Sequence, residues 1–163
     1  MKRTAFSLIL LISLLLCSCA APRGDFFEIF KSGFEAQLEG RIYELDFSAT
    51  LQVEKGADGG VSPATVTFYA PKELAGTVLT RAADGAVTIE VGDLAVADTG
   101  GVGAALFSLF PTAAAITDTT VSDEGHTVVS FEGGELTLLP DGTPYKIKTP
   151  DVSATVVEFK KST

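Results

Sequence analysis

The chain has 163 residues, in which 21 acidic side chains outnumber 12 basic ones and give a formal charge of −9. Without Lys2 and Arg3, ten basic side chains stand against the same 21 acids, a charge of −11 for residues 19–163. Phosphate contacts need clustered Lys and Arg, so this balance argues against a nucleic-acid-binding protein. Anionic lipid repels so acidic a domain, which argues against a peripheral membrane protein held by charge.

Residues 1–18 are predicted to be an export signal. Lys2 and Arg3 form a positively charged start, and an apolar run follows over Phe6–Leu16. A run of about ten residues is too short to cross a hydrocarbon core about 30 Å thick as a helix. A signal peptide is therefore expected here, and not a transmembrane anchor. The remaining 145 residues, 19–163, suit one domain.

The end of this segment, Leu16–Cys19, resembles the bacterial lipoprotein signal. In that signal an aliphatic residue at −3 and a small residue at −1 precede a cysteine that becomes lipid-modified, and Cys19 has Leu16 and Ser18 at these positions. The resemblance implies a lipid anchor on Cys19. Two alternatives remain: secretory cleavage near residues 20–21, which would release a soluble protein, and a Cys17–Cys19 disulfide, which is geometrically poor at this separation.

A lipidated Cys19 would place the protein beside a membrane. The predicted tether, residues 19–24, reaches roughly 20 Å when fully extended. Two acyl chains suffice for durable anchoring where one is marginal. The expected location is therefore the extracytoplasmic side of the cell membrane, with residues 25–163 forming a single domain. Because Cys17 would leave with the signal, that domain would hold neither a free thiol nor a disulfide.

A short helix is predicted over Asp25–Phe34. Phe26, Phe30 and Phe34 recur at helical spacing, and Asp25 can cap the first turn. The aromatic stripe is expected to pack on the core of the domain, with contact to lipid headgroups as the alternative.

From Glu35 onward the hydrophobic period becomes two, which is typical of β-strands. Tyr43–Lys55 alternates strictly and predicts a long antiparallel strand with one apolar face. Turn signals at intervals of about ten residues predict further strands paired in order as a meander. These strands are expected over Thr65–Tyr69, Thr77–Arg81, Val87–Val91, Leu94–Ala97, Ala113–Val121, Thr127–Phe131, Glu135–Leu139, Tyr145–Thr149 and Val152–Phe159.

One segment interrupts this pattern. Gly101–Phe110 is apolar at helical spacing and ends before Pro111, which predicts a short helix between strands. Ser108 is its only polar side chain, so the helix is expected to be buried or to plug a cavity.

This arrangement resembles the lipoprotein-carrier (LolA-like, LppX-like) half-barrel superfamily. The stretch Glu135–Thr149, with its Asp141-Gly142 turn and Pro144–Lys148 strand, is similar to the closing hairpin of that group, and Val152–Phe159 to its last strand. The resemblance implies a mainly β (α+β) fold. A strongly curved antiparallel meander sheet, the half-barrel, would be covered by the N-terminal helix and the short mid-chain helix.

Members of this superfamily hold acyl chains or other apolar molecules between sheet and helices. The resemblance implies such a cavity here, and ordinary core packing is the alternative for each of its residues, because the same alternation makes a filled or a hollow barrel. The candidate lining residues are Phe47, Leu51, Phe68, Val78, Ile89 and Phe131 of the sheet, with Leu106, Phe107, Leu109 and Phe110 as the plug.

Catalytic and metal chemistry have little support in the sequence. His126 is the single histidine and follows Gly125 at a predicted turn, so a zinc site lacks ligands. No nucleophile elbow, phosphate-binding glycine loop or calcium loop is present. We therefore expect a protein that is not an enzyme and has no cofactor and no metal.

The leading hypothesis for function is a membrane-anchored extracytoplasmic lipoprotein that binds a lipid or other apolar ligand in a half-barrel cavity. The competing hypothesis is an interaction lipoprotein, with a solid core, that docks a partner protein through its sheet surface. No nucleic-acid partner is expected.

Overall fold

In the computed structural model, the structure describes residues 32–55, 61–99, 101–110 and 115–162. These residues form one open antiparallel sheet of eleven strands and one short helix, α3 (Val102–Phe107). The strands are β1 (Phe34–Ile42), β2 (Leu45–Val53), β3 (Ala64–Ala70), β4 (Val78–Arg81), β5 (Val87–Val91), β6 (Leu94–Asp98), β7 (Ile116–Val121), β8 (Thr127–Phe131), β9 (Gly134–Leu138), β10 (Pro144–Lys148) and β11 (Val152–Lys161).

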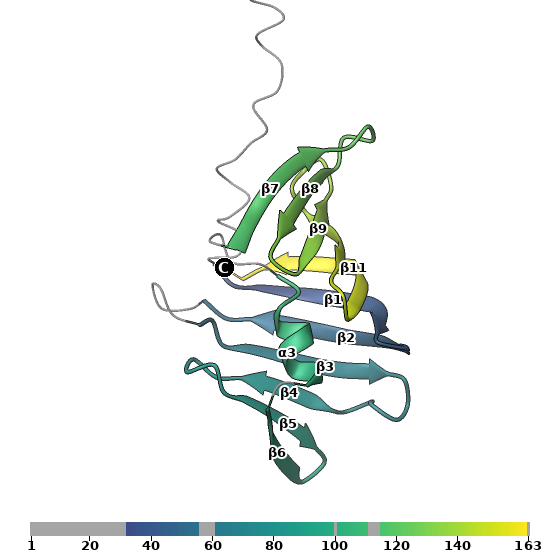
Figure 1. Ribbon diagram of the computed structural model, residues 1–163. Helices are drawn as coiled ribbons and strands as arrows, with labels where there is room; N and C mark the ends of the chain where they lie inside the picture. Colours follow the sequence, from purple (N-terminus) through teal and green to yellow (C-terminus); the bar gives the residue numbers. More distant parts are fainter. Residues whose placement is uncertain (1–31, 56–60, 100, 111–114, 163) are drawn as a thin grey trace, which may run out of the picture.

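The sheet consists of two meanders joined at its centre. The strand order is β6-β5-β4-β3-β2-β1-β11-β10-β9-β8-β7, so β1 pairs with β11 and the edges are β6 and β7. Figure 1 shows that β7, β8 and β9 lie at a steep angle to β1–β5, so that the two halves of the sheet are turned relative to each other. The right-handed twist between adjacent strands accumulates across such a wide sheet and produces this curvature.

The junction of the two halves depends on a residue without a side chain. Gly40 of β1 pairs with Ala154 of β11, and a Cβ atom built on Gly40 would lie 2.6 Å from the Ala154 Cα atom and 2.8 Å from its Cβ atom. Real Cβ atoms do not approach so closely. The two central strands can therefore meet in this register because residue 40 is glycine.

Alternation along the strands separates a buried face from an exposed one. In β2, Phe47 and Leu51 are buried, and in β3 their neighbours Val66 and Phe68 are buried as well. The rings of Phe47 and Phe68 meet edge to face, with centroids 6.0 Å apart. The buried apolar side chains of both meanders form one cluster, and burial of this apolar surface is the main stabilising contribution.

Helix α3 packs against one face of the sheet, which we call the inner face (Figure 1). At Gly103 there is no room for a side chain, because a Cβ atom would lie 2.7 Å from Val87 Cγ1 and 3.2 Å from Leu79 Cδ2. The Asp98 carboxylate accepts hydrogen bonds from the N–H groups of Gly101 and Gly103, both at 2.9 Å. Asp98 thus satisfies free N–H groups at the start of the helix.

Several predictions from the sequence are confirmed. Val87–Val91 and Thr127–Phe131 are strands with the expected bounds, and the mid-chain helix forms within Gly101–Phe110. Leu106 of this helix and Leu109, just after its end, are completely buried, as expected for an apolar segment.

Three details of the predicted fold were wrong. Tyr43, expected within a strand, lies with Glu44 in the turn between β1 and β2, at a φ of 51°. Phe34, the expected end of an N-terminal helix, begins β1; the rest of that predicted helix lies outside the described residues. The meander is also not continuous, because β6 and β7 do not pair.

Candidate functional site

Most of the predicted cavity residues lie together on the inner face, where they pack against one another. Ile89 and Phe110 are partly buried against the cluster that the others form. The fully buried members are Phe47, Leu51, Phe68, Leu106, Phe107, Leu109 and Phe131.

Val78 lies apart from this group. It pairs with Thr67, whereas the next residue, Leu79, pairs with the buried Val66. Because successive side chains of a strand point to opposite faces, Leu79 belongs to the inner face and Val78 to the outer one. The sequence has two adjacent aliphatic residues here, so alternation alone does not decide between them.

Near the β6 edge, the inner face carries apolar side chains that remain exposed to solvent. Across β4, β5 and β6, the row Leu79–Ile89–Val96 passes from 1% exposed at Leu79, through the partly buried Ile89, to 60% exposed at Val96. The next row pairs Val91, 53% exposed, with Leu94, 73% exposed. We call Ile89, Val91, Leu94 and Val96 the β5–β6 patch.

This patch was not predicted from the sequence. The strands that carry it were expected, but the sequence does not indicate that β6 is an edge strand. Large contiguous apolar surfaces are uncommon on soluble monomers, and those that occur are candidates for interaction sites.

A half-buried cation, Arg81, lies on the same face, opposite Val87 of β5. Its Nε and Nη2 atoms donate to the carbonyl oxygen of Ser62, at 3.2 and 3.0 Å, and Nη1 donates to that of Phe107 at 3.3 Å. Burial lowers the pKa of Arg81 from its ordinary value. No carboxylate among the described residues pairs with it, so backbone carbonyls and the Phe107 ring are its surroundings.

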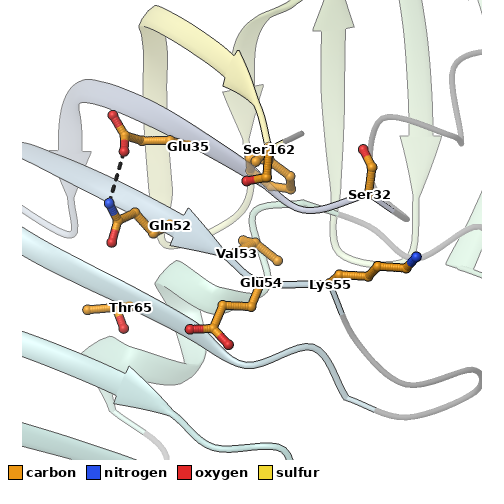
Figure 2. Close-up of a pocket in the computed structure, with 9 residues that line it drawn as sticks. Ser32, Glu35, Gln52, Val53, Glu54, Lys55, Thr65 and Ser162 are labelled. Carbon is orange, nitrogen blue, oxygen red and sulfur yellow. Dashed lines mark hydrogen bonds between the residues drawn. The ribbon is translucent and has the colours of Figure 1, made fainter.

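A cavity of about 530 Å³ opens where β1 begins and β2 ends (Figure 2). Its walls combine the apolar Phe34 and Val53 with charged side chains, and Gln52 donates to Glu35 at 2.9 Å. None of the predicted cavity residues lines it. The full lining is Ser32, Phe34, Glu35, Gln52, Val53, Glu54, Lys55, Thr65 and Ser162. This mixed surface differs from the apolar cavity that the sequence led us to expect.

The described residues contain no group of three or more His, Cys, Asp or Glu side chains placed to hold a metal ion. His126 lies in the loop between β7 and β8, where its Nδ1 atom is 3.5 Å from Glu124 Oε2 and its ring is 5.8 Å from that of Tyr145. Within the described ranges no helix is long and apolar enough to span a bilayer. Cys19 lies outside these ranges.

Comparisons with known proteins give similarity in fold alone. No protein-family model matches the sequence, and no curated protein matches it either. Among solved structures, an uncharacterized conserved protein from Thermus thermophilus is 18% identical, with a TM-score of 0.51 over 85% of this chain and 84% of that one. MucB is 13% identical, with a TM-score of 0.50 over 85% of this chain and 58% of its own. Both similarities support a large antiparallel sheet as the architecture of this chain.

Proposed function

We propose that this chain is a lipid-anchored extracytoplasmic membrane protein that binds a lipid or another apolar ligand and catalyses no reaction. In this proposal the sheet is the half-barrel of the lipoprotein-carrier superfamily. The binding surface is the β5–β6 patch, since the predicted lining residues farther inside pack against one another.

The observation that carries this proposal is the exposure of Val91, Leu94 and Val96 on the inner face, in rows that continue the buried core. Fully burying one aliphatic side chain contributes about 1.5–3 kcal/mol. Since each of these three is more than half exposed, covering them would contribute about 1–2 kcal/mol apiece. An acyl chain laid across the two rows would gain this contribution and that of its own methylene groups.

The anchor belongs to the same proposal. Leu16 and Ser18 stand at the positions that a lipoprotein signal requires before Cys19. Acylation there would hold the domain next to a source of apolar ligands. Metabolic labelling with an alkyne analogue of palmitate should mark the full chain and should not mark Cys19→Ala. An unlabelled wild-type chain, or an equally labelled variant, would disprove the anchor.

Ligand binding is tested separately from the anchor. The full chain, extracted from host membranes in mild detergent, is analysed by native mass spectrometry and then after denaturation. A covalent lipid stays on the denatured chain, whereas a bound ligand is released and is identified in the organic extract. We expect a released acyl species in stoichiometric amount. A chain that carries only its covalent lipid would contradict ligand binding and favour the competing hypothesis, docking of a partner protein.

A further inference from the structure

Strand β6 has a free edge in the described structure, because the sheet ends there and only β5 pairs with it. The two-residue turn Gly92–Asp93 joins Val91 to Leu94, so these two residues exchange hydrogen bonds. Hydrogen-bonded pairs alternate with non-hydrogen-bonded pairs along an antiparallel ladder, so the backbone groups of Val96 also bond to Ile89 of β5. The N–H and C=O groups of Ala95 and Ala97 therefore point away from the sheet.

The two edges of the sheet differ in how well they are protected against further pairing. β7 carries Asp118, and its register shifts between Ile116 and Asp118. Bulges and charges of this kind discourage the addition of another strand. β6 has no proline and a regular ladder with β5, and the carboxylate of its one acid, Asp98, is already bound by the N–H groups of Gly101 and Gly103. It is the edge that is open to a further strand.

We propose that a second copy of this chain pairs antiparallel along β6, around a two-fold axis at Val96. This inference goes beyond the proposed function and does not depend on the anchor or on a ligand. The register follows from the length of the strand, because only a centre at Val96 pairs all five residues of Leu94–Asp98. Ala95 then lies opposite Ala97 of the second copy, and their free backbone groups exchange hydrogen bonds.

The side chains are compatible with this arrangement. The two-fold axis places Val96 against its own copy and Leu94 opposite Asp98, whose carboxylate already binds the N–H groups of Gly101 and Gly103. If the pairing continues beyond the strand, Asp93 meets Thr99, so that no two carboxylates lie directly opposite each other. Like charges directly opposite would be destabilising, and this register avoids them.

Pairing would join the two inner faces into one surface. The β5–β6 patches of both copies would then adjoin, with an α3 helix on the far side of each, and form one apolar trough. Five-residue strands bury less than the roughly 800 Å² per partner of a standard interface. The dimer is therefore reversible and is favoured wherever copies are concentrated, as on a membrane surface.

Disulfide cross-linking tests the register. Val96 and its copy form a non-hydrogen-bonded pair, with Cα atoms about 4.5 Å apart, which a disulfide can bridge. The full chain with Val96→Cys is expressed and purified, and it is oxidised with copper phenanthroline at low and at high protein concentration. Peptide mass spectrometry should locate a bond between two copies of residue 96. Val121→Cys, on the β7 edge and 57% exposed, is the matched control and should cross-link far less.

A second variant separates strand pairing from chance collision. Ala95→Pro removes an N–H group that points away from β5, so it should leave the fold intact, as circular dichroism of the purified chain would verify. Added to Val96→Cys, it should reduce cross-linking about tenfold or more, since the symmetric pair loses two hydrogen bonds. Equal cross-linking of Val96→Cys and Val121→Cys, or no effect of Ala95→Pro in a folded chain, would overturn the proposal.

Discussion

The guanidinium of Arg81 lies over the aromatic ring of Phe107, with Cζ 5.0 Å from the ring centroid, and also donates to the carbonyl oxygen of the same residue at 3.3 Å. One side chain of β4 therefore contacts both the face of a ring and the backbone at the end of α3. Its other hydrogen bonds go to Ser62, which precedes β3. Arg81 thus connects the helix to the sheet and to the segment before β3.

Replacing Arg81 should destabilise the fold. In Arg81→Met the two carbonyl oxygens lose a charged donor, and the loss is expected to be about 1–3 kcal/mol in the free energy of unfolding. Urea unfolding measures it. Arg41→Met, which removes an exposed arginine on β1, is the matched control and should leave the midpoint of urea unfolding almost unchanged. Equal effects of the two substitutions would show that the Arg81 contacts contribute little.

A side chain at position 103 should displace α3. Gly103→Val places a Cβ atom where Val87 Cγ1 and Asp98 Oδ2 lie, 2.7 and 2.6 Å away. Overpacking of this kind costs about 1–3 kcal/mol. Ala104→Val adds the same β-branched side chain to the exposed side of the same helix and should cost about 0.5 kcal/mol. Thermal unfolding of both variants gives the comparison, and similar losses would mean that α3 does not pack tightly at Gly103.

Gly40→Val should separate the two halves of the sheet. Any side chain at position 40 meets the backbone of β11 at Ala154, which cannot move without breaking the central ladder. We expect a loss of about 3 kcal/mol or more and faster hydrogen exchange in both β1 and β11. Gln37 is exposed on the same strand, and the control variant Gln37→Val should leave hydrogen exchange in β11 unchanged. Retained protection of β11 in Gly40→Val would contradict the close contact.

The carboxylate of Asp46 should titrate below its ordinary pKa. Arg41 Nε donates to Asp46 Oδ1 at 2.8 Å, and this hydrogen bond, with the charge of Arg41, lowers the pKa of Asp46. The lowered pKa means that the pair stabilises the folded state above the ordinary pKa of Asp46, and that this contribution is lost as the pH falls through the folded value.

NMR titration of the carboxyl carbons checks this pair. Arg41→Gln should raise the pKa of Asp46. Asp141, whose pKa is lowered by hydrogen bonds from Thr143, serves as the internal control and should not respond to the substitution. An unchanged pKa of Asp46 in Arg41→Gln would show that the ion pair does not form in solution.

Local patterns in the sequence were sufficient to place most strands. Val87–Val91 lies between Asp84-Gly85 and Gly92-Asp93, and such turn signals mark both ends of a strand. The β1–β2 turn has no such signal, because Tyr43 adopts a positive φ without being Gly, Asn or Asp. The sequence therefore did not predict that a turn at Tyr43 and Glu44 separates β1 from β2.

The order of the strands and the location of the patch depend on pairing between residues distant in sequence. β1 pairs with β11, about 120 residues later in the chain, and no local pattern encodes this contact. Its consequence is that β6 and β7 become the two edges. The exposure of Leu94 and Val96 follows from that pairing, which is why no local pattern in the sequence indicates the β5–β6 patch.

Photocrosslinking with a fatty acid tests the central claim, binding of an apolar ligand at the β5–β6 patch. A 16-carbon fatty acid carrying a diazirine is added to membranes that contain the full chain, and the membranes are irradiated. Peptide mass spectrometry then identifies the residues of the chain to which the fatty acid is attached. We predict labelling within Val87–Asp98, reduced about tenfold in the double variant Leu94→Ser and Val96→Ser. Val157 on β11 is 57% exposed, and the control variant Val157→Ser should leave the labelling unchanged. Labelling spread over the chain, or unaffected by the double variant, would contradict the claim.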